Sequence, residues 1–503
     1  MKHFRLRFGM IACVSLFSYA NTFAEGVEDD FADFDDTPMV SEKAEKTEKV
    51  KKAKSEPIPI GDENDDMDGF DDEGESTDTV VIENNVSEEN ELDEVPVEDT
   101  SSEEEKSSWI PGLTGKITEQ VAYSLYSSAP HNDISSVKST LFLDYEHKFE
   151  NGWKLKANAR AYYDAIYSLR GTSKFSAQEL KELRSEIELF DAYLEGSLTD
   201  NFDVKVGRQV VVWGRSDTLR VTDVLNPLDN RRPAMVDIED LRLPVTMAKF
   251  DYFIGDWRIT PIAILEQRFS KNPPFGSVFN PSPLVAPSTE KYDDVTYALS
   301  VGAEFSAWDV NFYAARLRND EGQLVLPSPT QNTALIKHDK INMFGTAVNV
   351  LSGSWLFKTE LAYFDGLKYF STGDEEFSRT DLLLGVEYNG IADTLISYDI
   401  VSRNFSSFNP RLNLEAIPLR KNDYQHAFRV SSDFINATVT VNYLLSLYGE
   451  KLDEGGFQRA WVKYDLLDGV NVNVGVVDYI GGSALFDVIK DNDMIFADIA
   501  YSF

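Results

Sequence analysis

The sequence WKLKANARAYYDA, residues 153–165, alternates almost strictly between apolar and polar side chains. One face carries Trp153, Leu155, Ala157, Ala159, Ala161 and Tyr163, and the other carries Lys154, Lys156, Asn158, Arg160 and Asp164. A period of two with one apolar face predicts a β-strand. The same alternation recurs at 295–305, 459–466 and 470–476, so the body of the chain is predicted to be all-β.

The connections between these stretches alternate in length. Short turns, such as 150–152, 255–256 and 352–354, alternate with long polar loops. The longest of these loops runs over about 214–244. This regular alternation is typical of a transmembrane antiparallel β-barrel with tight periplasmic turns and extended outer loops. A soluble β-sandwich, the alternative that strand alternation alone leaves open, does not require this pattern.

The pattern predicts about eighteen strands, each roughly long enough to cross a bilayer obliquely. We expect the strands to begin near residues 115, 136, 153, 187, 202, 245, 257, 294, 308, 340, 355, 379, 393, 424, 437, 457, 470 and 491. Sixteen strands is the second choice, because 187–212 and 340–350 alternate imperfectly. An even number places both ends of the barrel on the periplasmic side.

The last predicted strand carries a targeting pattern. Ile495, Ala497, Ile499, Tyr501 and Phe503 share one face, and the sequence ends on the aromatic residue. This resembles the terminal strand that the outer-membrane barrel-assembly machinery recognises, with Tyr501 and Phe503 as the signal.

Composition excludes several classes of protein. The 503 residues carry a net charge of −37 and a single cysteine, Cys13. A nucleic-acid-binding face and a disulfide framework are therefore not expected. No run approaches the roughly 18 apolar residues of a transmembrane helix.

The charge divides the chain into three parts. Residues 1–24 have Lys2, Arg5 and Arg7 before an apolar run and a small-x-small site, which predicts a secretory signal peptide. Cys13 invites a lipoprotein interpretation, but the apolar run continues beyond it. Residues 25–107 are strongly acidic and predict a disordered periplasmic tail. Residues 108–503 form the predicted outer-membrane barrel.

The acidic tail contains a duplicated octet, DDFADFDD at 29–36 and DDMDGFDD at 65–72. Two copies on one tether would give avidity for a basic, apolar groove, with Phe31, Phe34, Met67 and Phe70 as docking residues. The alternative is a solvated tail with a chance repeat. Residues 64–75 partly match a calcium-binding EF-hand loop, but position eight is acidic and no amphipathic helix flanks it, so no metal site is predicted.

If the apolar rows face lipid, the opposite rows face the lumen. Both signs of charge occur there in similar numbers, which predicts a wet interior that polar solutes can follow, or cross-strand ion pairs that only satisfy buried charges. The main lumen candidates are Lys154, Lys156, Arg160, Asp164, Lys205, Arg429, Arg459 and Lys463.

The run VGRQVVVWGRSD, 206–217, breaks the alternation. Val206 and Arg208 are two positions apart, so a regular strand would place both on the same face, and an arginine should not face lipid. A bulge at Gly207 would turn Arg208 inward. The charged, turn-rich residues that follow predict either an ordered loop folded into the pore or an external loop held by its own salt bridges. The pore or constriction candidates are Arg208, Gln209, Trp213, Arg215, Asp217, Asp229, Arg231 and Arg232.

Three segments carry a resemblance to a known family: GRQVVVWG at 207–214, NPLD at 226–229 and LRLP at 241–244. They resemble functionally uncharacterised proteobacterial outer-membrane β-barrels, which are typically encoded beside RND-type exporters and a periplasmic partner. The resemblance implies movement of a lipid or other hydrophobic compound across or into the outer membrane. It does not cover the acidic tail and supplies no binding residue.

An enzyme is not predicted, because the histidines lack a nucleophile motif near them, and no cofactor is expected. The first hypothesis is a porin-like outer-membrane channel for a small or amphipathic solute. The second is a non-conducting anchor, whose acidic tail recruits an RND-type exporter, a periplasmic shuttle or another transport or assembly partner.

Overall fold

The computed structural model describes residues 110–503 except 237, 285 and 328–333. The predictions for the signal peptide, the acidic tail and its docking residues therefore lie outside the described residues. None of the helices in the described part of the chain is long and apolar enough to cross a membrane.

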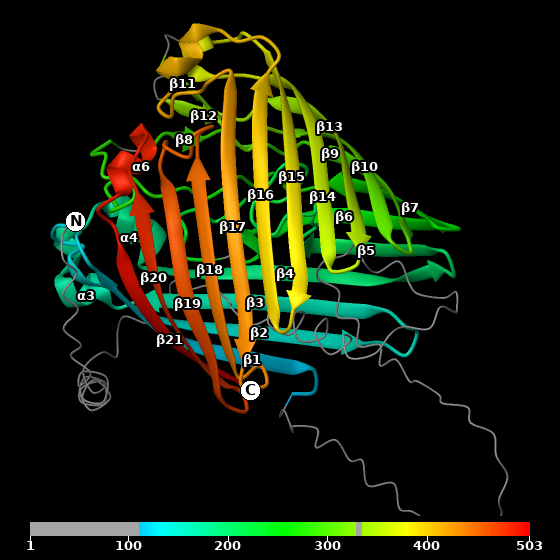
Figure 1. Cartoon of the computed structure of the whole chain (residues 1–503), viewed down its shortest axis with the longest axis horizontal. Helices are drawn as coiled ribbons and strands as arrows, with labels where there is room; N and C mark the ends of the chain where they lie inside the picture. The colour runs from blue at the N-terminus through cyan, green and yellow to red at the C-terminus, as the bar shows by residue number, and fades with distance from the viewer. Residues whose placement is uncertain (1–109, 237, 285, 328–333) are drawn as a thin grey trace, which may run out of the picture.

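Eighteen antiparallel strands form one closed barrel, which confirms the predicted fold and strand number. β1 and β21 close it, so the first and last strands lie side by side (Figure 1). The barrel strands are β1 (Leu113–Ser124), β2 (Asp133–Lys148), β3 (Lys154–Asp164), β4 (Ser185–Thr199), β5 (Phe202–Gln209), β6 (Val245–Ile254), β7 (Trp257–Ile264), β9 (Thr296–Phe305), β10 (Trp308–Arg318), β13 (Lys340–Ser352), β14 (Trp355–Leu367), β15 (Phe377–Ile391), β16 (Thr394–Phe405), β17 (Asn422–Phe434), β18 (Val439–Tyr448), β19 (Gly456–Leu467), β20 (Val470–Ile480) and β21 (Met494–Ser502).

Tight turns join the strands at one end of the barrel and long loops at the other. Both β1 and β21 reach the end with the tight turns. The long-loop end carries small elements: α3 (Ile166–Arg170), η3 (Thr172–Lys174), α4 (Ala177–Leu183), α5 (Ile238–Leu241), β8 (Ser288–Thr289), β11 (Gln323–Val325), β12 (Leu335–Lys337), η4 (Phe370–Thr372), η5 (Pro410–Leu414) and α6 (Ala484–Ile489). We call this end the outer end.

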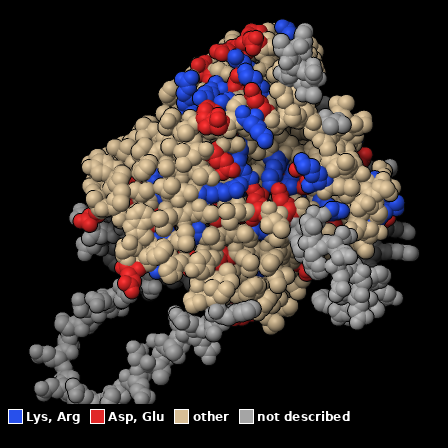
Figure 2. Space-filling view, turned by 180° about the vertical axis from the view of Figure 1, so that it is seen from behind, with Lys and Arg blue, Asp and Glu red and all other residues tan. Residues whose placement is uncertain are grey.

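The outward rows of the strands are apolar, as the alternation predicts. In β14, Phe357, Leu361 and Tyr363 are exposed, whereas Glu360 and Ala362 between them are buried. Charged side chains are sparse over most of the visible face and gather over its middle and upper part (Figure 2). An apolar outer surface around a closed barrel is what a bilayer requires.

Candidate functional site

A long segment folds back into the barrel between β5 and β6. This inserted segment, residues 210–244, begins where β5 ends. There Gln209 is fully buried, and its side-chain amide donates to the Met247 carbonyl at 3.1 Å. Asn226 joins the two ends of the segment, because its Oδ1 accepts from the Val211 amide at 2.8 Å and its Nδ2 donates to the Leu243 carbonyl at 2.9 Å.

Glu360 on β14 anchors the inserted segment at about mid-strand. Its buried carboxylate accepts from the backbone amides of Arg215 at 2.6 Å, Ser216 at 3.1 Å and Thr222 at 3.0 Å, and from the Thr222 hydroxyl at 2.7 Å. A carboxylate that accepts several amide hydrogen bonds is a strong local anchor, because each bond is charge-assisted.

Two further carboxylates bind the same part of the segment. Asp399 on β16 accepts from the hydroxyls of Ser216 and Thr218 at 2.6 and 2.7 Å. Asp309 on β10 accepts from the Arg215 guanidinium at 2.6 Å. Asp309 is the second residue of its strand after a tight turn, so Arg215 reaches toward the tight-turn end.

Apolar contacts dock the segment on one side of the lumen. Trp213 stacks on Tyr313 of β10 with ring centroids 4.6 Å apart. Leu219, Val221 and Leu225 are buried in the same cluster. The wall supplies inward-facing apolar residues from the outer parts of β6, β7, β9, β10 and β13–β16, which we call the apolar arc; they include Met247, Ile262, Ala315, Met343, Leu383 and Val401.

The far part of the segment crosses to the opposite wall. Arg231 pairs with Asp229 and Glu186, both at 2.6 Å, and donates to the Tyr162 hydroxyl at 3.1 Å. Arg232 pairs with Asp164 at 3.0 Å. The Pro233 carbonyl accepts from the Tyr479 hydroxyl at 2.5 Å. The segment is therefore attached to strands on both sides of the barrel.

The eight predicted lumen charges lie in the inward rows of β17–β21 and β1–β5, which we call the charged arc. Lys154 pairs with Glu195 at 2.7 Å, and Lys156 with Asp144 at 3.7 Å. Lys463 pairs with Asp465 at 3.3 Å, and Arg459 lies over the ring of Trp461. The others also face inward: Arg160 over Phe190, Asp164 beside Arg232, Lys205 over Tyr193, and buried Arg429.

The expected bulge at Gly207 is wrong. β5 keeps its register with β4 and β6 through Gly207 and Arg208. Gly207 instead has a φ of 135°, a conformation that favours glycine. The Arg208 guanidinium reaches Glu188 of β4 at 3.4 Å and the Pro244 carbonyl at 3.4 Å, at the outer end of β5.

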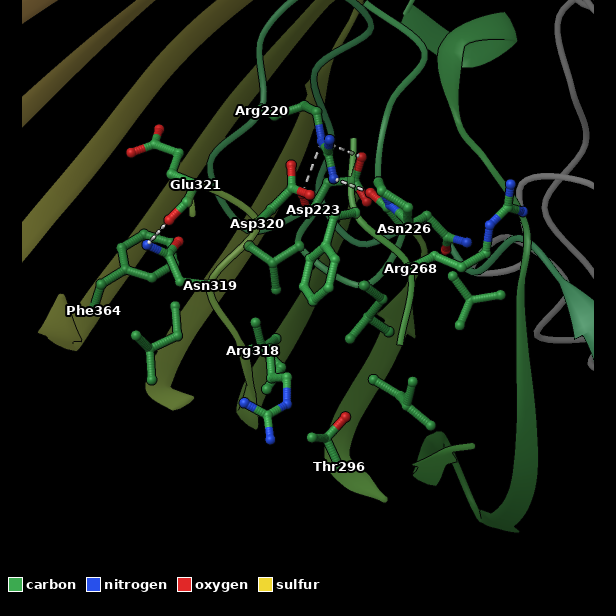
Figure 3. A pocket seen from close by; sticks show the side chains of 18 of the residues that line it. Arg220, Asp223, Asn226, Arg268, Thr296, Arg318, Asn319, Asp320, Glu321 and Phe364 are labelled. Carbon is green, nitrogen blue, oxygen red and sulfur yellow. Dashed lines mark hydrogen bonds and ion pairs between the residues drawn. The ribbon is translucent and has the colours of Figure 1, made fainter. Parts of the chain in front are cut away.

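Two cavities lie on opposite sides of the inserted segment. The outer cavity, about 220 Å³, has an apolar wall that includes Ile264, Leu317 and Phe364, and charged side chains that include Arg220 and Arg318 (Figure 3). The inner cavity, about 160 Å³, lies nearer the tight turns and is lined by Trp213, Arg215, Asp217, Asn311 and Lys358 among others. Asp217 lies 3.6 Å from Lys358. The segment separates these two spaces.

Three titratable groups in the loops, which we call the rim, contact residues that line the outer cavity. Burial raises the pKa of Tyr292 to about 12 and lowers the pKa of His338, whose ring stacks on Phe269. Burial opposes ionisation of Asp294, but its ion pairs with Lys340 and Arg318 lower its pKa overall. At neutral pH this rim therefore carries a stable ion-pair cluster beside two uncharged rings.

Sequence reasoning missed that Glu360 and Asp399 anchor the segment. It also missed the apolar arc. Two features of the sequence could have indicated the apolar arc. In some strands consecutive residues are all apolar, as at Leu382, Leu383 and Leu384, and at 340–350 the alternation is imperfect. There Met343 and Ala347 face inward and are fully buried.

A family described as "Protein of unknown function (DUF1302)" matches residues 132–503. No curated protein matches the sequence. Among solved structures, OccAB3 of Acinetobacter baumannii is 11% identical with a TM-score of 0.48, covering 78% of this chain and 98% of that one. OccK9 (OpdG) of Pseudomonas aeruginosa is 10% identical with a TM-score of 0.48, covering 78% and 97%. OpdK of Pseudomonas aeruginosa, solved with vanillate, is 8% identical with a TM-score of 0.45, covering 78% and 98%.

Proposed function

We propose that this chain, which belongs to the DUF1302 family, is an outer-membrane channel for a small or amphipathic solute. The inserted segment is its constriction. The observation that carries the proposal is the pair of cavities separated by that segment. A barrel built only to anchor would not need an interior with water-sized space on both sides of an ordered loop.

The composition of the lumen supports a solute that is polar in part and apolar in part. One wall is the apolar arc and the other is the charged arc. Arg215 and Asp217 line the inner cavity, where they lie close to any solute that passes the segment. We propose no catalytic role and no cofactor for these residues.

The location follows from the same architecture. A closed barrel with an apolar exterior suits the bacterial outer membrane, and we propose that the barrel-assembly machinery reads Tyr501 and Phe503. Both ends of the barrel reach the tight-turn side, so we place residues 25–107 in the periplasm. An RND-type exporter or a periplasmic shuttle is the partner that we propose for this tail.

Conductance of the purified barrel in planar bilayers tests the proposal. We expect discrete steps, and Arg208→Gln or Arg215→Gln should lower the preference for anions, because a fixed positive charge is lost beside the path. Arg215→Lys keeps the charge and is the matched control. Arg316→Gln removes an exposed arginine on the outward face and should change nothing.

A silent wild-type barrel would instead favour the anchor hypothesis. Deletion of residues 25–107 addresses the partner separately. If the conducting barrel keeps its steps but no longer retains a transporter in pull-down, the tail recruits that partner. If retention is unchanged, the docking octets have no such role.

A further inference from the structure

The barrel wall has a step between β4 and β5. The last pair of residues joining these strands is Ala192 with Arg208, whereas β4 continues outward to Ser185. Residues 185–191 therefore have no strand partner on the β5 side, although on their other side β3 pairs with β4 as far as Ser185. Loop residues 226–230, 241–244 and 265–271 occupy the place beside this free edge.

The loop residues form a small layer of their own. The Asp229 amide donates to the Leu241 carbonyl, the Leu243 amide to the Pro227 carbonyl and the Lys271 amide to the Leu228 carbonyl, at 2.7 to 2.9 Å. Within the described residues, no backbone hydrogen bond joins this layer to residues 185–191 of β4. We call the boundary between them the seam.

Side-chain ion pairs join the two sides of the seam. Glu186 pairs with Lys271 at 2.6 Å and with Arg231 at 2.6 Å. Glu188 pairs with Lys271 at 2.8 Å, with Arg208 at 3.4 Å and with Arg268. Such contacts break and re-form without disturbing a β-ladder, unlike the ladder that joins Ser185–Leu189 to β3 on the other side of β4.

The outer side of the seam is apolar. Ile187 and Leu189 point outward and are 73% and 47% exposed. Their partners on β3 are Ala161 and Ala159. These two residues lie two and four positions from Tyr163, toward the tight-turn end of the strand. An outward aromatic residue near a strand end is typical of the membrane interface. The seam therefore lies at the level of the outer leaflet.

The inner side of the seam meets the outer cavity. Glu266, Arg268 and Phe269 of the loop layer line that cavity, together with Asn226 and Pro227 of the inserted segment. The cavity combines an apolar wall with arginines and carboxylates in equal number, and Arg220, Arg318 and Arg403 are each paired with a carboxylate. A molecule with an apolar body and a charged head fits this combination.

We propose that the seam is a lateral opening through which an amphiphile with a charged head passes between the outer cavity and the outer leaflet. The proposal rests on the proposed function in that the outer cavity is the solute's path. It goes further by naming the class of solute and a route that avoids the bulk water outside the cell.

The test closes the seam with a reversible cross-link. Glu186→Cys and Lys271→Cys place two thiols across it, and a bis-methanethiosulfonate reagent joins them; the predicted mature chain has no other cysteine. Leu143→Cys with Ala159→Cys is the matched control across a fully paired boundary. Transfer of a fluorescent fatty acid into proteoliposomes and conductance for small ions are both measured.

We expect the seam cross-link to abolish fatty-acid transfer, the conductance to persist, and reduction to restore transfer. The control cross-link should change neither. Undiminished transfer with the seam closed would overturn the lateral route, and so would a parallel loss of transfer and conductance, because the solute would then share the axial path. Absence of conductance in the unmodified barrel overturns the proposed channel instead, whatever the transfer shows.

Discussion

The two arcs of the inner wall obey the same alternation but carry opposite chemistry. In the charged arc, Lys156 and Lys463 alternate with outward apolar residues, and ion pairs satisfy them. In the apolar arc, Met247 and Met343 occupy the equivalent inward rows and are fully buried. The difference is the inserted segment, whose apolar side chains pack against the apolar arc and whose arginines pair with the charged arc. Whether the inward residues of a strand are apolar or charged therefore depends on which part of the chain packs against them.

Trp213→Ala should have the largest effect on the packing of the inserted segment against the apolar arc. It removes a buried indole that stacks on Tyr313, and such truncations cost about 3–5 kcal/mol. We expect the inserted segment to detach while the barrel stays folded, and the conductance to rise. Hydrogen exchange at the amides of residues 211–225 reports the detachment. Trp355→Ala, a change at a half-exposed outward residue, should leave that exchange unaltered.

Glu360→Gln should loosen the same segment less. The neutral side chain keeps the shape but weakens the charge-assisted hydrogen bonds, at a cost of about 2 kcal/mol. The Arg215, Ser216 and Thr222 amides should then exchange about 30-fold faster. Glu387→Gln, on the next strand and bound to Lys358, is the matched control. Equal exchange in both variants would show that Glu360 is not an anchor.

Lys463→Met should barely change stability in the charged arc. Its partner Asp465 is half exposed, so the loss should stay below about 1 kcal/mol. Removal of one positive charge from the lumen should nevertheless shift the permeability ratio toward cations, and Lys463→Arg should not. A large fall in thermal stability would mean that this arc, too, has a covering partner.

A pH effect should appear where the segment crosses to the charged arc. Burial raises the pKa of Asp493, in the loop before β21, to about 6 from 3.8, with nearby Asp478 adding to the rise. Because the folded value is the higher one, its stabilising contribution is complete below about pH 4 and is lost as the pH rises through about 6. The thermal unfolding midpoint should fall over this range, although the Tyr479 amide, which donates to Asp493, binds the ionised carboxylate more strongly. Asp493→Asn should remove that dependence.

The sequence predicts the outward rows well, because hydrocarbon imposes the same requirement on every strand. All eighteen predicted strand starts fall close to those in the structure, and the eight predicted lumen charges lie on inward rows. The apolar arc could not be predicted in the same way, because Met343 or Leu383 faces inward only when a partner from elsewhere in the chain covers it. The conformation at Gly207 was missed for a related reason. The break in the apolar–polar alternation shows that the strand is irregular there, but the pairing with the neighbouring strands decides whether the irregularity is a bulge or an unusual backbone conformation.

The closing pair of strands carries one more consequence. Gly115 of β1 exchanges two backbone hydrogen bonds of 2.9 Å with Phe503, and a Cβ at Gly115 would overlap the aromatic ring of that final residue. The aromatic ring at the closing boundary of the cylinder therefore fits only against a glycine that lies 388 positions earlier in the chain. This boundary forms only once both strands are in place, so closure of the barrel depends on a contact between residues that are almost the whole barrel sequence apart.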